Sequence, residues 1–179
     1  MKATGIVRRI DDLGRVVIPK EIRRTLRIKE GDPLEIFTNH DGEVIFKKYS
    51  VMNEISCNAS YVADIMFRLA GCPVLIFDTD HIISVSGVPK KEYLERRTSL
   101  NLEELMENRA VYCCDDENEC FESTDNFNAN AIGAAPVISN GDITGAVVFL
   151  RNDENKILNK MQKSLLLAAA QFLGKQTED

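Results

Sequence analysis

The chain has 179 residues, of which 44% are hydrophobic and 28% charged, and its net charge is −6. This composition is typical of soluble globular proteins and excludes a disordered chain, and the lack of an apolar run of about 20 residues excludes a membrane-spanning helix. The five cysteines are odd in number and irregularly spaced, which does not favour a disulfide framework. We therefore expect a cytoplasmic protein with reduced thiols.

The charge is divided unevenly along the chain. Residues 1–50 carry 11 basic and 8 acidic residues, a net charge of +3, whereas residues 51–179 carry 11 basic and 20 acidic residues, a net charge of −9. Such an asymmetry suggests a module for nucleic acid or another anionic surface joined to a second module. We therefore expect two domains, 1–50 and 51–179.

The first residues predict two strands followed by a helix. Residues 3–10 and 15–18 favour strands around a turn in which Gly14 can adopt a positive φ. Pro19 suits the first turn of a helix, which the spacing of apolar residues predicts over 20–28.

A second hairpin is predicted over residues 34–49. Its turn falls at Asp41 and Gly42, and an Asp-Gly pair is a strong hairpin signal. The whole unit of about fifty residues is too small to bury a sufficient core alone, and it has no disulfide or metal to compensate. We therefore expect an obligate dimer in which strands of two chains interleave.

Arginine is abundant at the N-terminal end, with six arginines and three lysines in the first thirty residues. From charge alone, these arginines either form a solvated surface, partly neutralised by nearby carboxylates, or bind an anionic partner. The guanidinium group pairs bidentately with phosphate and with guanine edges, so the choice of arginine favours double-stranded DNA. The six are Arg8, Arg9, Arg15, Arg23, Arg24 and Arg27.

The blocks GRVVIP and EIRRTL, continuing through GEVIFKKY, resemble the swapped-hairpin DNA-binding domain of the AbrB family of bacterial transition-state regulators. The similarity covers nearly all of residues 1–49. It implies an intertwined dimeric barrel that binds AT-rich, deformable DNA without a strict consensus. The positions that match the DNA-contacting arginines of the family are Arg8, Arg15, Arg23 and Arg24, and Arg9 is a further candidate; Arg23 and Arg24 are expected to be exposed.

The second domain begins and ends with amphipathic helices, because apolar residues recur there at intervals of three and four. Two uses of these stripes are open: packing against the sheet of the domain itself, and contact with a second protomer. The predicted oligomer interface comprises Met52, Ile55, Ala59, Val62, Met66, Leu69, Leu158, Met161, Leu165 and Phe172.

Between these helices the pattern predicts paired strands, two short helices and a long acidic loop. The second helix is expected to begin at a cap on Asn101. Paired strands with helices at the edges indicate an α+β fold with an antiparallel sheet. The strands are expected over 73–77, 82–86, 110–114, 131–139 and 143–151, the helices over 90–97 and 101–108, the loop over 115–130, and the last hairpin turns at Asn140 and Gly141.

The order PVLIFDTD, IISVSG and APVISNGDITGAVVFL before a last helix resembles a GAF domain. Together with the AbrB-type N-terminus, this combination resembles sporulation regulators of endospore-forming bacteria. The resemblance implies a transcriptional activator or repressor on the nucleoid of the forespore, assembled as a homotetramer through helices of the GAF-like domains. The Asn-Lys, Phe and Asp-Glu pattern of cyclic-nucleotide-binding GAF domains is absent, so no cofactor is predicted and any ligand of this domain is unidentified.

Other functional classes find less support in the sequence. Cys113, Cys114 and Cys120 form no C-x-x-C pair and the chain has only two histidines, so no metal site is predicted. A nucleophile elbow and a phosphate-binding glycine loop are also absent, so we do not expect an enzyme. The alternative is an antitoxin that binds operator DNA and a toxin, but its tail should be short and disordered, unlike residues 51–179.

Overall fold

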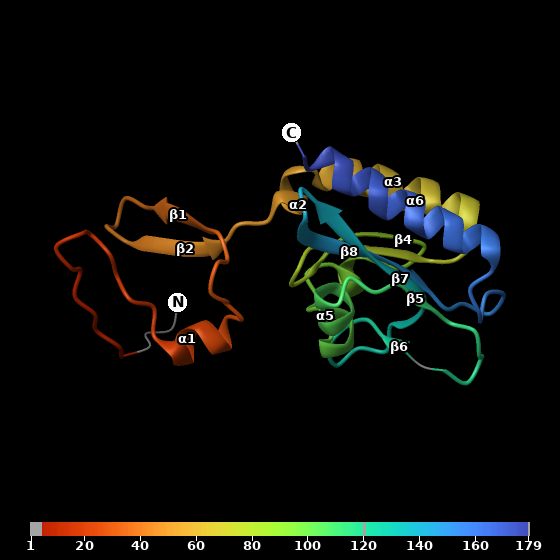
Figure 1. Cartoon of the computed structure of the whole chain (residues 1–179), viewed down its shortest axis with the longest axis horizontal. Helices are drawn as coiled ribbons and strands as arrows, with labels where there is room; N and C mark the ends of the chain where they lie inside the picture. Colours follow the sequence, from red (N-terminus) through yellow and green to blue (C-terminus); the bar gives the residue numbers. More distant parts are fainter. Residues whose placement is uncertain (1–4, 120, 179) are drawn as a thin grey trace. The chain divides into compact units, whose positions relative to one another are not determined.

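The computed structural model of the chain describes residues 5–119 and 121–178 and is shown in Figure 1. It divides into two compact units, Met1–Tyr49 and Ser50–Asp179.

The N-terminal unit contains helix α1 (Lys20–Thr25) and an antiparallel hairpin of strands β1 (Leu34–Thr38) and β2 (Val44–Lys48). The hairpin is confirmed, and Gly42 adopts a φ of 80° in its turn. Helix α1 ends three residues earlier than expected, because Arg27 adopts a left-handed φ of 53°.

The predicted first hairpin of this unit differs from the structure. Among the described residues, 5–18 form no strand, although Gly14 has the expected positive φ of 75°; Ala3 and Thr4 lie outside the described residues. A strand requires a neighbour for its backbone hydrogen bonds, and β1 and β2 pair only with each other in the described part of the unit. Residues 5–18 therefore have no partner strand among the described residues of the chain.

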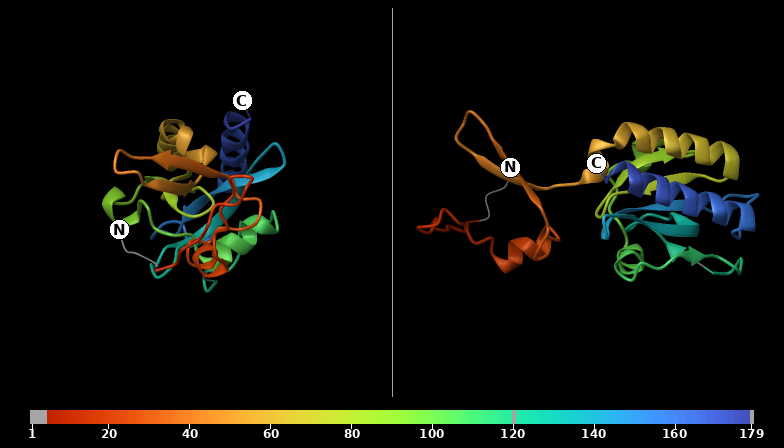
Figure 2. Two further views of the ribbon diagram at one scale, coloured as in Figure 1. Left: turned by 90° about the vertical axis from the view of Figure 1, so that its left-hand side faces the viewer. Right: turned by 45° about the horizontal axis from the view of Figure 1, so that its top comes forward.

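The second unit is a sheet between two layers. Its antiparallel strands are arranged in the order β4-β3-β8-β7-β5, and β6 also pairs with β7. Helices α3 and α6 lie side by side on one face and α5 lies on the other (Figures 1 and 2). The elements are α2 (Val51–Glu54), α3 (Ser56–Ala70), β3 (Val74–Phe77), β4 (Ile82–Ser86), α4 (Lys90–Tyr93), α5 (Leu100–Glu107), β5 (Tyr112–Cys113), β6 (Phe121–Glu122), β7 (Asn130–Ser139), β8 (Asp142–Leu150) and α6 (Lys160–Gln176).

The sheet is buried on both faces. Along β3, Val74 and Ile76 pack into the core beneath α3 and α6, whereas Leu75 and Phe77 pack into the core beneath α5. This alternation follows from the two-residue period of a strand, and it explains why β3 is apolar throughout. The predicted α+β class with an antiparallel sheet is confirmed.

Several predicted boundaries in this unit are corrected. Helix α5 is capped by Ser99, whose hydroxyl accepts the backbone N–H of Leu102 at 3.1 Å, and not by Asn101. The predicted helix 90–97 is a single turn, since Glu95 adopts a φ of 63°. The turn between β7 and β8 is confirmed, with φ of 49° at Asn140 and 88° at Gly141.

Two glycines set the distances between backbone segments. A β-carbon built on Gly174 of α6 would overlap the carbonyl oxygen of Ile138 in β7, and one built on Gly145 of β8 would overlap that of Phe77 in β3. Helix α6 therefore contacts the sheet backbone to backbone near its C-terminal end.

Replacing Gly174 by alanine should destabilise the second unit, because the added methyl group forces α6 away from β7. Overpacking of this kind costs about 1 to 3 kcal/mol. Urea unfolding of the full chain measures the effect, with Ser164→Ala on the exposed face of the same helix as control. Equal stability of Gly174→Ala and the wild type would contradict the close contact.

Candidate functional site

The candidate DNA-binding arginines of the N-terminal unit differ in exposure. Arg8, Arg9 and Arg24 are exposed, and the side chain of Arg15 is 69% exposed. Arg23, which was expected to be exposed, is half-buried, and its Nε atom is buried without a hydrogen-bond partner among the described residues. Four of the five predicted arginines can therefore reach a large anionic partner directly from one chain.

Asp11 organises the loop that presents Arg15. One carboxylate oxygen accepts the backbone N–H groups of Leu13 at 3.1 Å and Arg15 at 2.7 Å, and the other accepts the Nε–H of Arg15 at 2.8 Å. These bonds lower the pKa of Asp11 below its ordinary value of 3.8. The bond from the Arg15 backbone has the largest effect, and the bond from the Arg15 side chain has the next largest. The loop thus holds the Nε edge of the Arg15 guanidinium, while the side chain as a whole remains mostly exposed.

The N-terminal unit has almost no core of its own. Pro19 is the only buried residue among residues 5–49. Large apolar side chains are exposed instead, including Val7 (87%), Ile10 (71%) and Val17 (71%). An apolar surface of this extent on so small a unit marks an interaction surface.

The predicted oligomer interface of the second unit divides into two groups. Met52, Ala59 and Val62 are at most 7% exposed and lie in the unit's own core, so they are not available to a second protomer. Four further positions are half-buried and pack against the same core: Ile55, Met66, Leu158 and Leu165.

The remaining three positions are exposed, namely Leu69 (54%), Met161 (57%) and Phe172 (51%). On α3, Tyr61 and Ile65 lie two turns and one turn before Leu69 and are also exposed. Helices α3 and α6 therefore each carry an exposed apolar stripe in addition to the stripe that packs on the sheet. The role of these exposed residues at an interface stays a prediction.

A polar pocket at one end of the sheet was missed by the sequence analysis. It has a volume of about 420 Å³ and lies entirely in the second unit, where β8 ends and β3 and β7 begin. The only signal in the sequence was the frequency of asparagine on both sides of β7 and β8, in NFNAN and NDENKILN. Asparagine is common in loops, so this signal did not indicate a site by itself.

The segment between β8 and α6, on one side of this pocket, is tied to both long helices. The side-chain amides of Asn152 and Asn155 donate to the carbonyl oxygen of Gly71, the residue that caps α3, at 2.9 and 3.0 Å. Gln162 of α6 is fully buried and donates to Asn155 Oδ1 and to the Ala70 carbonyl at 2.8 and 2.9 Å. The segment is therefore part of the α3 and α6 layer.

The cysteines occupy separate environments. Cys113 is half-buried at the end of β5 and Cys114 is buried, while Cys120 lies outside the described residues. In the described part of the chain, no group of three or more metal-ligating side chains is brought together. Nor does any helix of that part combine the length and apolarity that crossing a bilayer requires.

Comparison with known proteins places a boundary between two parts of the chain in the same region as the boundary between the two structural units. A family model described as "Stage V sporulation protein T C-terminal, transcription factor" matches residues 54–178, and one described as "Antidote-toxin recognition MazE, bacterial antitoxin" matches residues 7–51. The chain is 48% identical to stage V sporulation protein T of Bacillus subtilis over 99% of both proteins. It is also 51% identical to the transition state regulatory protein AbrB of the same organism, over 40% of this chain and 72% of that protein.

The fold of the second unit has solved counterparts. The GAF domain of a phosphoenolpyruvate-protein phosphotransferase from Coxiella burnetii aligns with a TM-score of 0.55 and 11% identity, covering 70% of this chain and 86% of that one. The chain is thus a two-unit protein with an AbrB-type N-terminal unit and a GAF fold. It belongs to the stage V sporulation protein T family.

The pH dependence of the Arg15 loop can be tested by NMR. Because the folded-state pKa of Asp11 is lowered, its bonds to Arg15 should be complete above the ordinary value of 3.8 and lost as the pH falls through the lowered value. Arg15→Ala removes the bond from the Arg15 side chain but keeps the bond from the backbone of residue 15. The pKa of Asp11 should therefore rise only part of the way toward its ordinary value. Carboxyl chemical shifts measure it, with Arg24→Ala as control; an unchanged pKa in Arg15→Ala would contradict the contact.

Proposed function

We propose that the chain is a DNA-binding transcriptional regulator of sporulation and not an enzyme. Its N-terminal unit binds double-stranded DNA as a dimer, and its GAF-like unit assembles the protein and senses a ligand. It acts in the cytoplasm, on the nucleoid of the forespore. This proposal rests on one observation: exposed arginines lie on a unit that has an exposed apolar surface and almost no core.

Two physical arguments support DNA as the partner. Phosphate contacts supply most of the affinity of such proteins, and a dimer doubles the number of available arginines. The Arg15 side chain is also partly pre-oriented by Asp11, which reduces the conformational entropy cost of binding. Shape readout of deformable, AT-rich sequence would then provide selectivity without a strict consensus.

The apolar surface of residues 5–18 supports the dimer. These residues carry exposed β-branched side chains, and the part of the chain that the structure describes offers them no partner strand. Strand exchange with a second copy would supply one. The exposed stripes of α3 and α6 provide a separate surface through which two dimers form a homotetramer. The half-buried Arg23 fits a positioning role beside the interface better than a direct phosphate contact.

An antitoxin is the second candidate, favoured by the family match over residues 7–51. Residues 54–178, however, fold as a sheet with two buried cores, whereas a toxin-binding tail should be short and extended. A regulator with a sensory and assembly unit is therefore the better explanation.

DNA binding should weaken steeply with salt through the exposed arginines. Fluorescence anisotropy on AT-rich and GC-rich duplexes should give a linear fall of log affinity with log salt concentration. The substitutions Arg8→Ala, Arg15→Ala and Arg24→Ala should each flatten this slope, by about one unit for every phosphate that the substitution leaves unneutralised. Arg109→Ala, an exposed arginine of the second unit, is the control. DNA binding that is unaffected by all three substitutions would contradict the proposed interface.

Assembly through the helices should depend on the exposed stripe residues. The double variant Leu69→Ser, Phe172→Ser should convert a tetramer into a dimer without loss of stability, because both side chains are about half exposed in the single chain. Sedimentation velocity measures the mass, with Gln171→Ser on α6 as control. An unchanged tetramer would place the contact between dimers elsewhere.

A further inference from the structure

We infer that the polar pocket of the second unit binds a zwitterionic small molecule of the amino acid class. The inference deepens the sensory role proposed above and rests on it. The pocket volume of about 420 Å³ lies near the lower end of the range for small-molecule sites, which suits a small metabolite.

The charged groups of the pocket are balanced. Arg151 and Lys156 supply two positive charges, and Glu117 and Asp153 supply two negative charges. A ligand with a single charge would be attracted by one pair and repelled by the other. A molecule that carries an ammonium and a carboxylate can use both signs.

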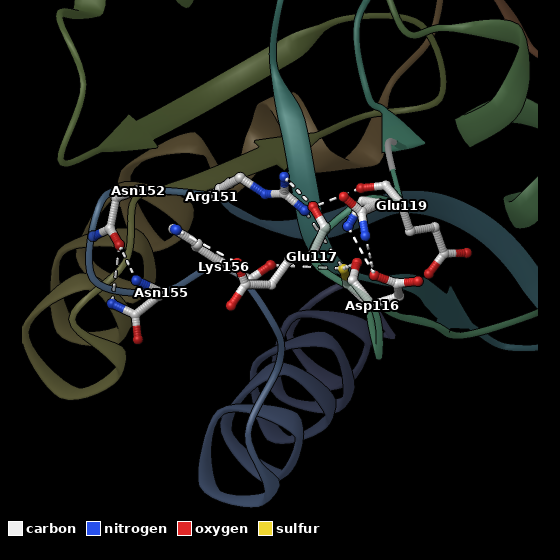
Figure 3. Close-up of polar contacts among 9 residues, drawn as sticks. Asp116, Glu117, Glu119, Arg151, Asn152, Asn155 and Lys156 are labelled. Carbon is white, nitrogen blue, oxygen red and sulfur yellow. Dashed lines mark hydrogen bonds and ion pairs between the residues drawn. The ribbon is translucent and has the colours of Figure 1, made fainter.

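The cations of the pocket have different tasks. Figure 3 shows Arg151 directed at the loop around Glu117 and Glu119, to whose backbone carbonyl oxygens it donates at 2.8 and 3.0 Å. Arg151 therefore holds this loop in place. Its Nε atom is buried and has no hydrogen-bond partner among the described residues.

Lys156 is the cation that a ligand can recruit. Its ammonium lies 3.4 Å from the carboxylate of Glu117, and the two side chains are 52% and 61% exposed (Figure 3). An ion pair this exposed is weak and is easily rearranged. A bound amino acid can separate the pair, with its carboxylate on Lys156 and its ammonium on Glu117.

The rest of the lining favours the same class. Amide side chains supply donors and acceptors together, which match the two ends of an amino acid. An apolar floor contacts the ligand side chain. The amides are Asn118, Asn128 and Asn130, while the amide of Asn152 is already bonded to Gly71 and Asn155; the floor is formed by Pro73, Val88, Tyr93, Ala129 and Leu150.

The test is isothermal titration calorimetry of the full chain with each of the twenty standard L-amino acids. At least one should bind with a Kd below about 10 mM. For that amino acid, the amine without the carboxylate and the acid without the ammonium should each bind about tenfold more weakly. No binding by any amino acid, or equal binding of either analogue, would overturn the inference.

Two variants test the orientation. Lys156→Gln and Glu117→Gln should each weaken binding by about tenfold, and in Glu117→Gln the acid analogue should bind as well as the amino acid itself. Lys163→Gln, an exposed lysine of α6 outside the pocket lining, is the control, and the melting temperature of each variant verifies the fold. Wild-type binding in both variants would place the ligand elsewhere and overturn the inference.

These outcomes are separable from a failure of the proposed function. DNA binding is measured on the arginines of the other unit, so absence of the salt-dependent signal there would leave the calorimetry unaffected. Conversely, a chain that binds DNA with the expected slope but no amino acid would refute the inference alone.

Discussion

The N-terminal unit buries almost none of its apolar side chains within one chain, and the proposed dimer and its DNA-binding surface both depend on this constraint. With Pro19 as the only buried residue of 5–49, the hydrophobic term that normally stabilises a domain is missing within one chain. In the proposed dimer, folding of this unit would be coupled to association with a second chain. A surface shared by two chains would also present each arginine twice, so that assembly and DNA recognition would depend on the same association step.

The second unit has the opposite character, since its sheet is covered on both faces and its long helices are joined at one end by hydrogen bonds. Asn152, Asn155 and Gln162 connect the segment beside the pocket to the C-terminal end of α3 and the beginning of α6. Polar contacts thus join the pocket-lining Asn152 to the adjoining ends of α3 and α6, the two helices that carry the exposed apolar stripes. Measuring ligand binding and assembly together in one experiment would test whether the two are coupled.

The sequence predicted the fold correctly where local signals, such as turn residues and apolar runs, were strong. Asp41-Gly42 and Asn140-Gly141 determine their own turns, and the apolar run of β3 indicates a strand buried on both faces. The first hairpin was wrong for one chain because strands depend on a partner that local sequence does not reveal. Val62 was assigned to the oligomer interface, but it lies in the core of its own unit. A stripe of apolar residues on a helix shows only that one face is buried, and not which surface covers that face. The pocket was missed because its lining converges from segments distant in sequence.

The glycine contacts of the second unit have a consequence for how this family can diversify. Gly174 and Gly145 hold backbone against backbone, so no larger residue fits there unless α6 or a strand moves. The pocket lies where β8 ends, and its charged residues Glu117, Asp153 and Lys156 are exposed loop residues that belong to neither core, whereas Ala129 and Leu150 of its floor are core residues. Substitutions at these charged loop residues can therefore change the chemistry of the proposed ligand site at little cost to folding, while the backbone contacts at Gly174 and Gly145 tolerate very little change.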